Sequence, residues 1–204
     1  TAATPGVNGV HNDHIADAAP MGWDIYVCAK AGTTGCFGVP TTTVVNAAKM
    51  ASLGDGSYDW WSVDPVWFAR NNSGSNIVAF YQVGPGECIY ADNASTAVLA
   101  AGTATVATAI SFAGYAPACS AVHIWSAAQN TQATARNCEF RLTSGGTWFG
   151  YAGVMMSTGA GNTAYVEQQM EIPIAYRDLA TSLYYLWSGA CTGGLSVYCQ
   201  GWRL

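Results

Sequence analysis

The strongest constraint on the fold of this 204-residue chain is a series of short C-terminal segments in which apolar and polar side chains alternate. In segment 163–172, one face carries Ala164, Val166, Gln168, Met170 and Ile172, and the other carries Tyr165, Glu167, Gln169 and Glu171. A period of two is typical of a β-strand with one face in the core. Strands are predicted at 121–126, 138–142, 147–155, 163–172, 181–188 and 195–203. Short strands separated by glycine turns predict a mainly β fold, an antiparallel, jelly-roll-like β-sandwich.

The N-terminal half is less regular. Segments 24–29, 76–83 and 88–91 have strand character, and 41–53 is typical of a short helix that ends at Gly54. Asp64 as N-cap, with Pro65 at the first helical position, predicts a second short helix. Residues 1–22 contain Gly, Asn and Pro without periodicity. We therefore expect an ordered N-terminal arm over 1–22 and a single β-sandwich domain over 23–204.

Charge is scarce. A typical soluble domain contains about 25% charged residues, whereas this chain contains 9% and has a formal net charge of −5. Half of the residues are apolar, which excludes intrinsic disorder. The 7 Lys and Arg side chains do not form the basic footprint of a nucleic-acid-binding protein. We therefore predict no nucleic-acid partner.

The longest uncharged stretch, 93–135, contains a part, 96–118, with the length of a membrane-spanning helix. This part is rich in Ala, Thr, Gly and Ser, which insert into a bilayer less favourably than Leu. Residues 104–112 also alternate with period two, as a strand does. We predict no membrane span.

The seven cysteines contain no Cys-x-x-Cys pair, and their wide spacing favours disulfides in an oxidising compartment. We predict a secreted or cell-surface protein with the bonds Cys28–Cys36, Cys119–Cys138 and Cys191–Cys199, and with Cys88 left over. Other pairings stay open, as does a cytosolic protein with small buried thiols. Two Asn-x-Ser sequons predict glycan acceptors at Asn71 and Asn93.

Two polar segments are candidates for metal binding. His11, Asp13, His14 and Asp17 carry donors suited to zinc or another divalent ion; the alternative is a polar loop whose Asp side chains form turns. Segment 54–61 resembles the start of a calcium loop but lacks its final Glu. We predict no cofactor, with calcium or zinc as the alternatives.

The same segment contains adjacent aromatic residues, Tyr58, Trp60 and Trp61. On a strand, Trp60 and Trp61 point to opposite faces. One of them then forms a flat platform for a sugar ring or a partner chain. The alternative is a pair of core tryptophans after a turn.

Carboxylates are the best candidates for catalysis. Glu167 and Glu171 share a strand face with Cα atoms about 13 Å apart, and glycosidase carboxyls lie about 5–9.5 Å apart. A carboxylate pair between Glu139, on another strand, and either Glu167 or Glu171 is geometrically easier. The alternative is a solvated sheet face. His123 lies in an apolar segment and is expected to be a core histidine with its hydrogen bonds satisfied.

Low charge together with 25 aromatic residues favours association. We therefore predict an extracellular structural subunit that binds copies of itself in a filament, coat or surface assembly. The alternatives are a secreted, lectin-like carbohydrate-binding sandwich and a small glycoside hydrolase. The weak carboxylate pattern favours a protein that is not an enzyme.

Overall fold

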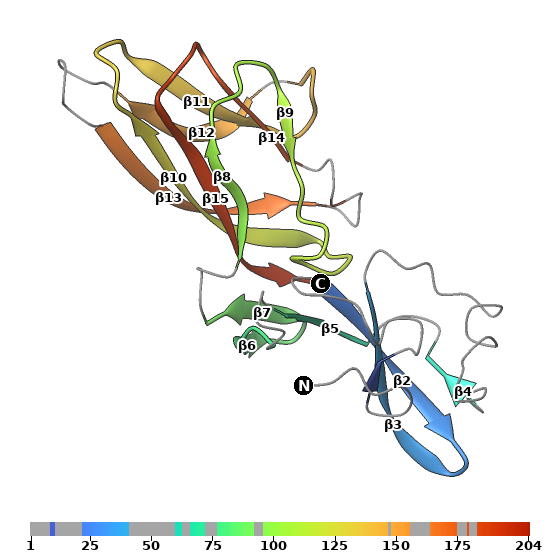
Figure 1. Ribbon diagram of the computed structural model, residues 1–204. Helices are drawn as coiled ribbons and strands as arrows, with labels where there is room; N and C mark the ends of the chain where they lie inside the picture. Colours follow the sequence, from blue (N-terminus) through green and yellow to red (C-terminus); the bar gives the residue numbers. More distant parts are fainter. Residues whose placement is uncertain are drawn as a thin grey trace. The chain divides into compact units, whose positions relative to one another are not determined.

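The computed structural model describes residues 9–10, 22–40, 60–62, 66–71, 77–91, 96–146, 148–155, 164–174, 179 and 183–204. Within these ranges the chain is mainly β, with fifteen strands and no helix (Figure 1). Contacts divide the chain into two compact units. The first contains Thr1–Val78 with Ala113–Pro117, and the second contains Ala79–Phe112 with Ala118–Leu204. The predicted boundary between an arm and a single domain stays a prediction, because most of 1–22 lies outside the described residues.

The first unit contains one sheet with the order β1-β3-β2-β4, in which β5 also pairs with β2. Its strands are β1 (Gly9–Val10), β2 (Gly22–Lys30), β3 (Thr33–Pro40), β4 (Trp60–Trp61) and β5 (Trp67–Arg70). β1 pairs with β3 in parallel, and the other pairings are antiparallel. A two-residue turn joins β2 to β3, with φ of 49° at Ala31 and 77° at Gly32. Positive φ at both positions matches the twist of a tight hairpin.

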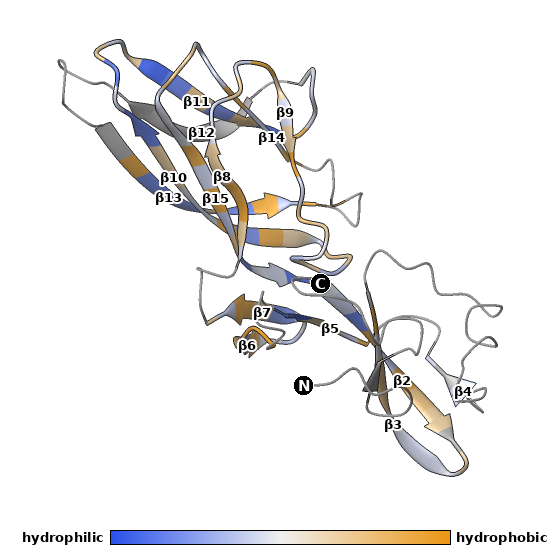
Figure 2. Cartoon of the chain, in the orientation of Figure 1, coloured by the Kyte–Doolittle hydropathy of each residue, from blue (hydrophilic) through white to orange (hydrophobic). Residues whose placement is uncertain are grey.

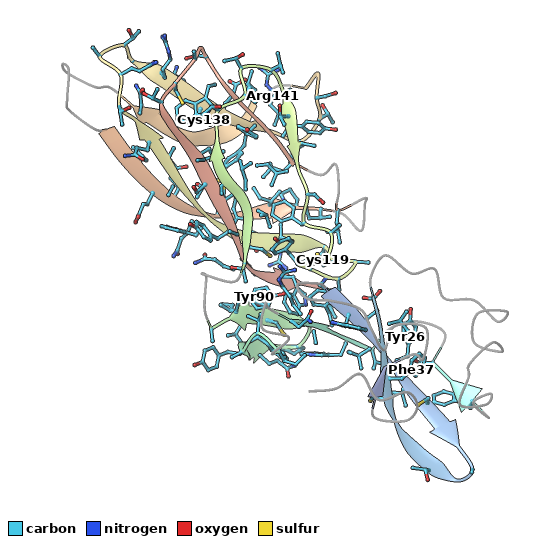
Figure 3. All side chains as sticks on the ribbon, viewed as in Figure 1. Tyr26, Phe37, Tyr90, Cys119, Cys138 and Arg141 are labelled. Atoms are coloured by element: carbon cyan, nitrogen blue, oxygen red, sulfur yellow. The ribbon has the colours of Figure 1, made fainter. Side chains whose placement is uncertain are left out.

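Aromatic side chains form the core of this unit. Tyr26 stacks on Phe37 with ring centroids 5.4 Å apart (Figure 3). Phe68 from β5 is also buried. Arg70 is buried as well, and it donates a hydrogen bond of 2.6 Å to the Gly114 carbonyl. Its guanidinium lies 3.7 Å from the ring centroid of Tyr115, so the charge is held by a carbonyl and an aromatic face.

The second predicted helix is wrong. The Asp64-Pro65 capping signal is followed by strand β5, which pairs with Gly22–Ile25 of β2. Residues 67–70 alternate between half-buried and buried positions. Burial of Phe68 and Arg70 against the sheet therefore outweighs a local helix-start signal. The helix predicted at 41–53 lies outside the described residues.

The second unit contains two antiparallel sheets. The larger has the order β13-β10-β15-β7-β6, and β8 also pairs with β15. Its strands are β6 (Phe80–Gly84), β7 (Glu87–Tyr90), β8 (Ala97–Gly102), β10 (Ala121–Asn130), β13 (Ala164–Pro173) and β15 (Gly193–Arg203). The smaller sheet has the order β12-β11-β14-β9. Its strands are β9 (Thr108–Ile110), β11 (Arg136–Arg141), β12 (Trp148–Met155) and β14 (Leu183–Trp187).

The six strands predicted in the C-terminal half are confirmed as β10 to β15. Each sheet buries one face, and Figure 2 shows hydrophobic and hydrophilic residues interspersed along these strands. Ile124 and Val197 are fully buried in the larger sheet, and Phe140 and Trp187 are buried in the smaller one. In the described part of the chain, no helix has the length and apolar character that a membrane crossing requires.

Candidate functional site

The outer face of the larger sheet carries polar and aromatic side chains. Along β10, even-numbered residues such as Val122 and Ile124 are fully buried, so odd-numbered residues project from the opposite face. The register then fixes their neighbours on the adjacent strands. We call this surface the outer face and define it by Glu87, Ile89, His123, Trp125, Gln169, Glu171, Tyr198, Gln200 and Arg203.

An aromatic pair lies at the middle of the outer face. Trp125 of β10 is directly opposite Tyr198 of β15. Their ring centroids are 4.8 Å apart with an interplanar angle of 39°. Both side chains are half-buried, so each ring offers part of its surface to a ligand. Gln169 of β13 is opposite Trp125 on the other side and is exposed.

A histidine flanked by two carboxylates lies next to this pair. The Nε2 atom of His123 is 3.2 Å from Oε1 of Glu87, and its Nδ1 atom is 3.8 Å from Oε2 of Glu171. Arg203 donates a hydrogen bond of 2.5 Å from Nη2 to Oε1 of Glu171. The prediction of a satisfied core histidine is therefore wrong. His123 lies on the outer face, and its buried Nε2 has no hydrogen-bond partner of good geometry in the described structure.

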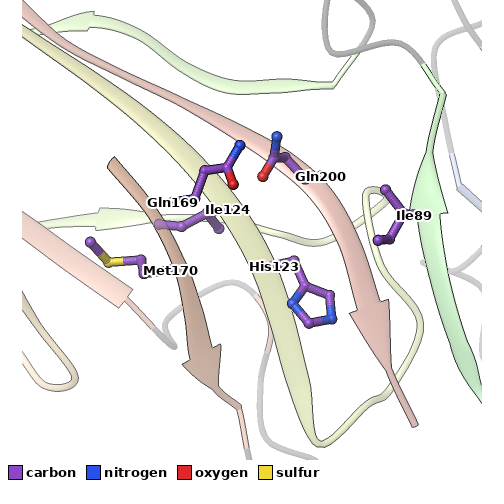
Figure 4. A pocket seen from close by; sticks show the side chains of 6 residues that line it. All are labelled: Ile89, His123, Ile124, Gln169, Met170 and Gln200. Carbon is purple, nitrogen blue, oxygen red and sulfur yellow. The ribbon is translucent and has the colours of Figure 1, made fainter. Parts of the chain in front are cut away.

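A cavity of about 430 Å³ opens between these groups and is lined by Ile89, His123, Ile124, Gln169, Met170 and Gln200 (Figure 4). A β-bulge contributes to its shape, because the register between β10 and β15 shifts between His123 and Ile124 and leaves Gln200 as the extra residue. Gly201 lies opposite both His123 and Ile89 and has no side chain to fill the space between them. A Cβ at Gly201 would be 2.1 Å from the Cys88 carbonyl oxygen.

The cavity lining therefore combines amide and imidazole groups with apolar side chains, and carboxylates and an aromatic surface lie beside it. Amide side chains donate and accept hydrogen bonds, and carboxylates accept them. Such a set suits a polar ligand that is rich in hydroxyl groups. Among the described residues, no group of three or more His, Cys, Asp or Glu side chains could hold a metal ion.

The predicted carboxylates lie in two different sheets. Glu139 is on β11 of the smaller sheet, where it accepts a 2.7 Å hydrogen bond from Nε of Arg141. Glu167 and Glu171 are on β13 of the larger sheet, opposite Ala127 and His123. Glu139 therefore lies in a different sheet from Glu167 and Glu171, and its pairing with either residue stays a prediction.

Most of the other predicted site residues lie outside the described part of the chain. These are His11, Asp13, His14, Asp17, Tyr58 and Asn93. Trp60 is described and is 55% exposed on β4, while Trp61 pairs with Cys28 in the same sheet. The Asn71 side chain is only 6% exposed and accepts a hydrogen bond from Nε1 of Trp23. The glycan predicted at Asn71 stays a prediction, at a residue that is mostly buried.

The cysteines are free thiols in the structure, and the three predicted bonds conflict with its geometry. Cys28 is opposite Gly35, so Cys28 and Cys36 point to opposite faces of the hairpin. Cys119 and Cys138 lie well apart within the second unit (Figure 3). Residues 193 to 199 form an extended part of β15, about 20 Å long. Cys191 and Cys199 are therefore beyond the Cα separation of about 7 Å that a disulfide tolerates.

The aromatic pair and the glutamines of this site were not predicted from the sequence. His123 and Trp125 are two residues apart, which places them on the same face of a strand. This signal is present in the sequence. The pairing of Trp125 with Tyr198 depends on which strands are neighbours, which is a property of the folded sheet. The sequence matches no known family model and no curated protein.

Proposed function

We propose that the outer face binds a carbohydrate. The observation that carries the proposal is the pairing of Trp125 and Tyr198 next to a cavity lined by Gln169 and Gln200. The C–H face of a sugar ring is apolar and packs on aromatic rings, while its hydroxyl groups need both donors and acceptors. Ligand sites of about 300–1,000 Å³ combine such apolar contact with a few oriented polar groups, and this cavity is within that range.

The architecture that we propose around this site is the sandwich that the sequence predicts. Two hydrogen bonds link the smaller sheet to residues in or after β8. Trp187 donates from Nε1 to the Gly102 carbonyl at 2.9 Å, and the Tyr185 hydroxyl accepts from the Ala104 amide at 3.4 Å. Such links support two sheets packed face to face, with the outer face on the solvent side. A secreted or cell-surface location is part of the same proposal.

A glycan array probed with the labelled chain tests the proposal, followed by calorimetric titration of the best oligosaccharide. We expect binding that Gln169→Ala weakens at least about tenfold, which is about 1.4 kcal/mol. Gln169 is exposed, so this substitution leaves the fold intact. Gln82→Ala removes an exposed glutamine side chain outside the outer face and is the matched control. Absence of binding across the array, or equal loss in both variants, refutes the proposal.

A second function, self-association, is proposed from strand β6. This strand is at the end of its sheet order and carries no charged residue. Its Tyr81 and Val83 side chains are 66% and 53% exposed. An uncharged edge strand with exposed apolar side chains pairs readily with another strand edge. This supports a structural subunit that binds copies of itself.

Light scattering after size-exclusion chromatography tests this second function. We expect oligomers that Val83→Lys dissociates, because a buried lysine opposes strand pairing. Val106→Lys introduces the same charge at a residue that is 70% exposed outside β6 and serves as the control. A strict monomer at every concentration contradicts self-association.

A further inference from the structure

Two buried cysteines of the second unit come from a strand and from a connection between two other strands. Cys138 is on β11, is fully buried and is opposite Trp187, the last residue of β14. Cys191 lies four residues after Trp187, in the segment that connects β14 to β15, and is also buried. Because β11 and β14 are antiparallel, the start of β11 lies beside the end of β14. Both cysteine side chains are buried in the interior at this position.

Hydrogen bonds fix the course of this connecting segment along β11. The Ser188 amide donates to the Asn137 carbonyl at 2.8 Å, and the Asn137 amide donates to the Ser188 hydroxyl at 3.0 Å. Arg136 donates from Nε to the Ala190 carbonyl at 2.8 Å. The chain from Ser188 to Ala190 therefore runs beside residues 136 and 137, and Cys191 is the next residue.

The electrostatics of the two thiols also reflect their proximity. Burial raises the pKa of Cys138 far above its ordinary value, and negative charge on Cys191 and Glu139 raises it further. Burial also raises the pKa of Cys191, but the Gly194 amide and the Arg136 guanidinium act in the opposite direction. Cys191 is therefore the better nucleophile of the pair, because the thiolate is the reactive form.

We propose that Cys138 and Cys191 form a disulfide bond that joins β11 to the connection between β14 and β15. The oxidant is a small-molecule disulfide such as oxidised glutathione. The Cys191 thiolate attacks one sulfur of the donor, and the other donor sulfur leaves as a thiolate. The Cys138 thiolate then attacks Sγ of Cys191, breaks the mixed disulfide and releases the second donor thiolate. The two cysteines lose two electrons, the donor gains them, and the two thiol protons pass to the released donor thiolates.

Peptide mapping tests this bond directly. The full chain is folded in a glutathione buffer, alkylated and digested with trypsin without reduction. Cleavage after Arg136, Arg141, Arg177 and Arg203 gives peptides 137–141 and 178–203. We expect these peptides as one linked species whose mass is lower by two hydrogens than the sum of the free peptides.

Because peptide 178–203 also contains Cys199, variants separate the two cysteines. Cys199→Ser is the matched control and keeps the linked species, whereas Cys191→Ser abolishes it. The closed loop spans about 50 residues, so we expect the oxidised chain to melt roughly 8–16 °C above the Cys138→Ser/Cys191→Ser double variant. Complete alkylation of Cys138 in the wild-type chain, or its linkage to another cysteine, overturns the proposal. The wild-type map decides the question even where a variant does not fold.

Discussion

Asp24 is an acidic residue held in an apolar environment, and its replacement gives the sharpest test of the first unit. It lies on β2, opposite Val39 of β3 and Phe68 of β5, and both neighbours are buried. Burial raises the pKa of the Asp24 carboxyl from 3.8 to about 6. The fold therefore favours the protonated acid and is destabilised by the charged form.

The direction and the size of the change in stability with pH follow from the pKa of Asp24. Between pH 3.8 and 6 the folded state binds the proton more tightly than the unfolded state, so stability falls as the pH rises through this range. Above pH 6 the stability contributed by protonated Asp24 is completely lost. A pKa change of about two corresponds to about 3 kcal/mol. Asp24 is partly exposed, so we expect roughly 1–3 kcal/mol after solvent screening.

Asp24→Asn removes this charge while keeping the size of the side chain. We expect the variant to be more stable than the wild type by roughly 1–3 kcal/mol at pH 7 and by less than about 1 kcal/mol at pH 4. Urea unfolding at the two pH values, followed by tryptophan fluorescence, measures the difference. Glu167→Gln removes a negative charge from an exposed position and is expected to change stability by less than about 0.5 kcal/mol. Equal stability of Asp24→Asn and the wild type at pH 7, or an equally large gain at pH 4, shows that burial does not raise the pKa of Asp24.

Three further substitutions test close contacts and buried groups, each by thermal unfolding. Gly201→Ala forces a Cβ against the Cys88 carbonyl, and we expect a loss of about 1–3 kcal/mol; an unchanged midpoint contradicts the close approach. Arg70→Ala removes the donor to the Gly114 carbonyl and the contact with Tyr115. We expect the free energy of unfolding to fall by about 2–4 kcal/mol. An unchanged stability shows that the charge is not buried. Phe140→Ala empties a fully buried site and should cost about 3–5 kcal/mol, whereas a loss below about 1 kcal/mol indicates that the site is open to water.

The strands of the C-terminal half were predictable because their signal is local. In β13, residues 166–171 alternate between half-buried and exposed positions, and the side chains themselves carry this period. The same locality explains the error at Asp64-Pro65, where a capping signal of two residues was outweighed by pairing of β5 with β2. A local sequence pattern indicates which secondary structure a segment prefers. Where two such preferences are of similar strength, long-range strand pairing decides between them.

The candidate site was less predictable because its parts meet only through sheet order. Trp125 and Tyr198 are 73 positions apart and become neighbours when β10 pairs with β15. The cysteine pairings failed for a similar reason. Proximity along the chain suggested Cys28–Cys36, but the register places these side chains on opposite faces. Short sequence separation is a poor guide to contact within a strand or hairpin, because alternate residues point in opposite directions.

The bulge between β10 and β15 also reverses, within a single strand, which set of alternate residues points into the core. Before the bulge, odd-numbered residues such as Val197 and Cys199 point into the core; after it, the even-numbered Trp202 is buried and Arg203 is exposed. One continuous strand can thus supply Tyr198 and Arg203 to the outer face although they are five positions apart. Deleting Gln200 would restore a regular ladder with Trp202 still in the core and Arg203 still on the outer face, whereas a regular strand that kept Gln200 would exchange the two residues.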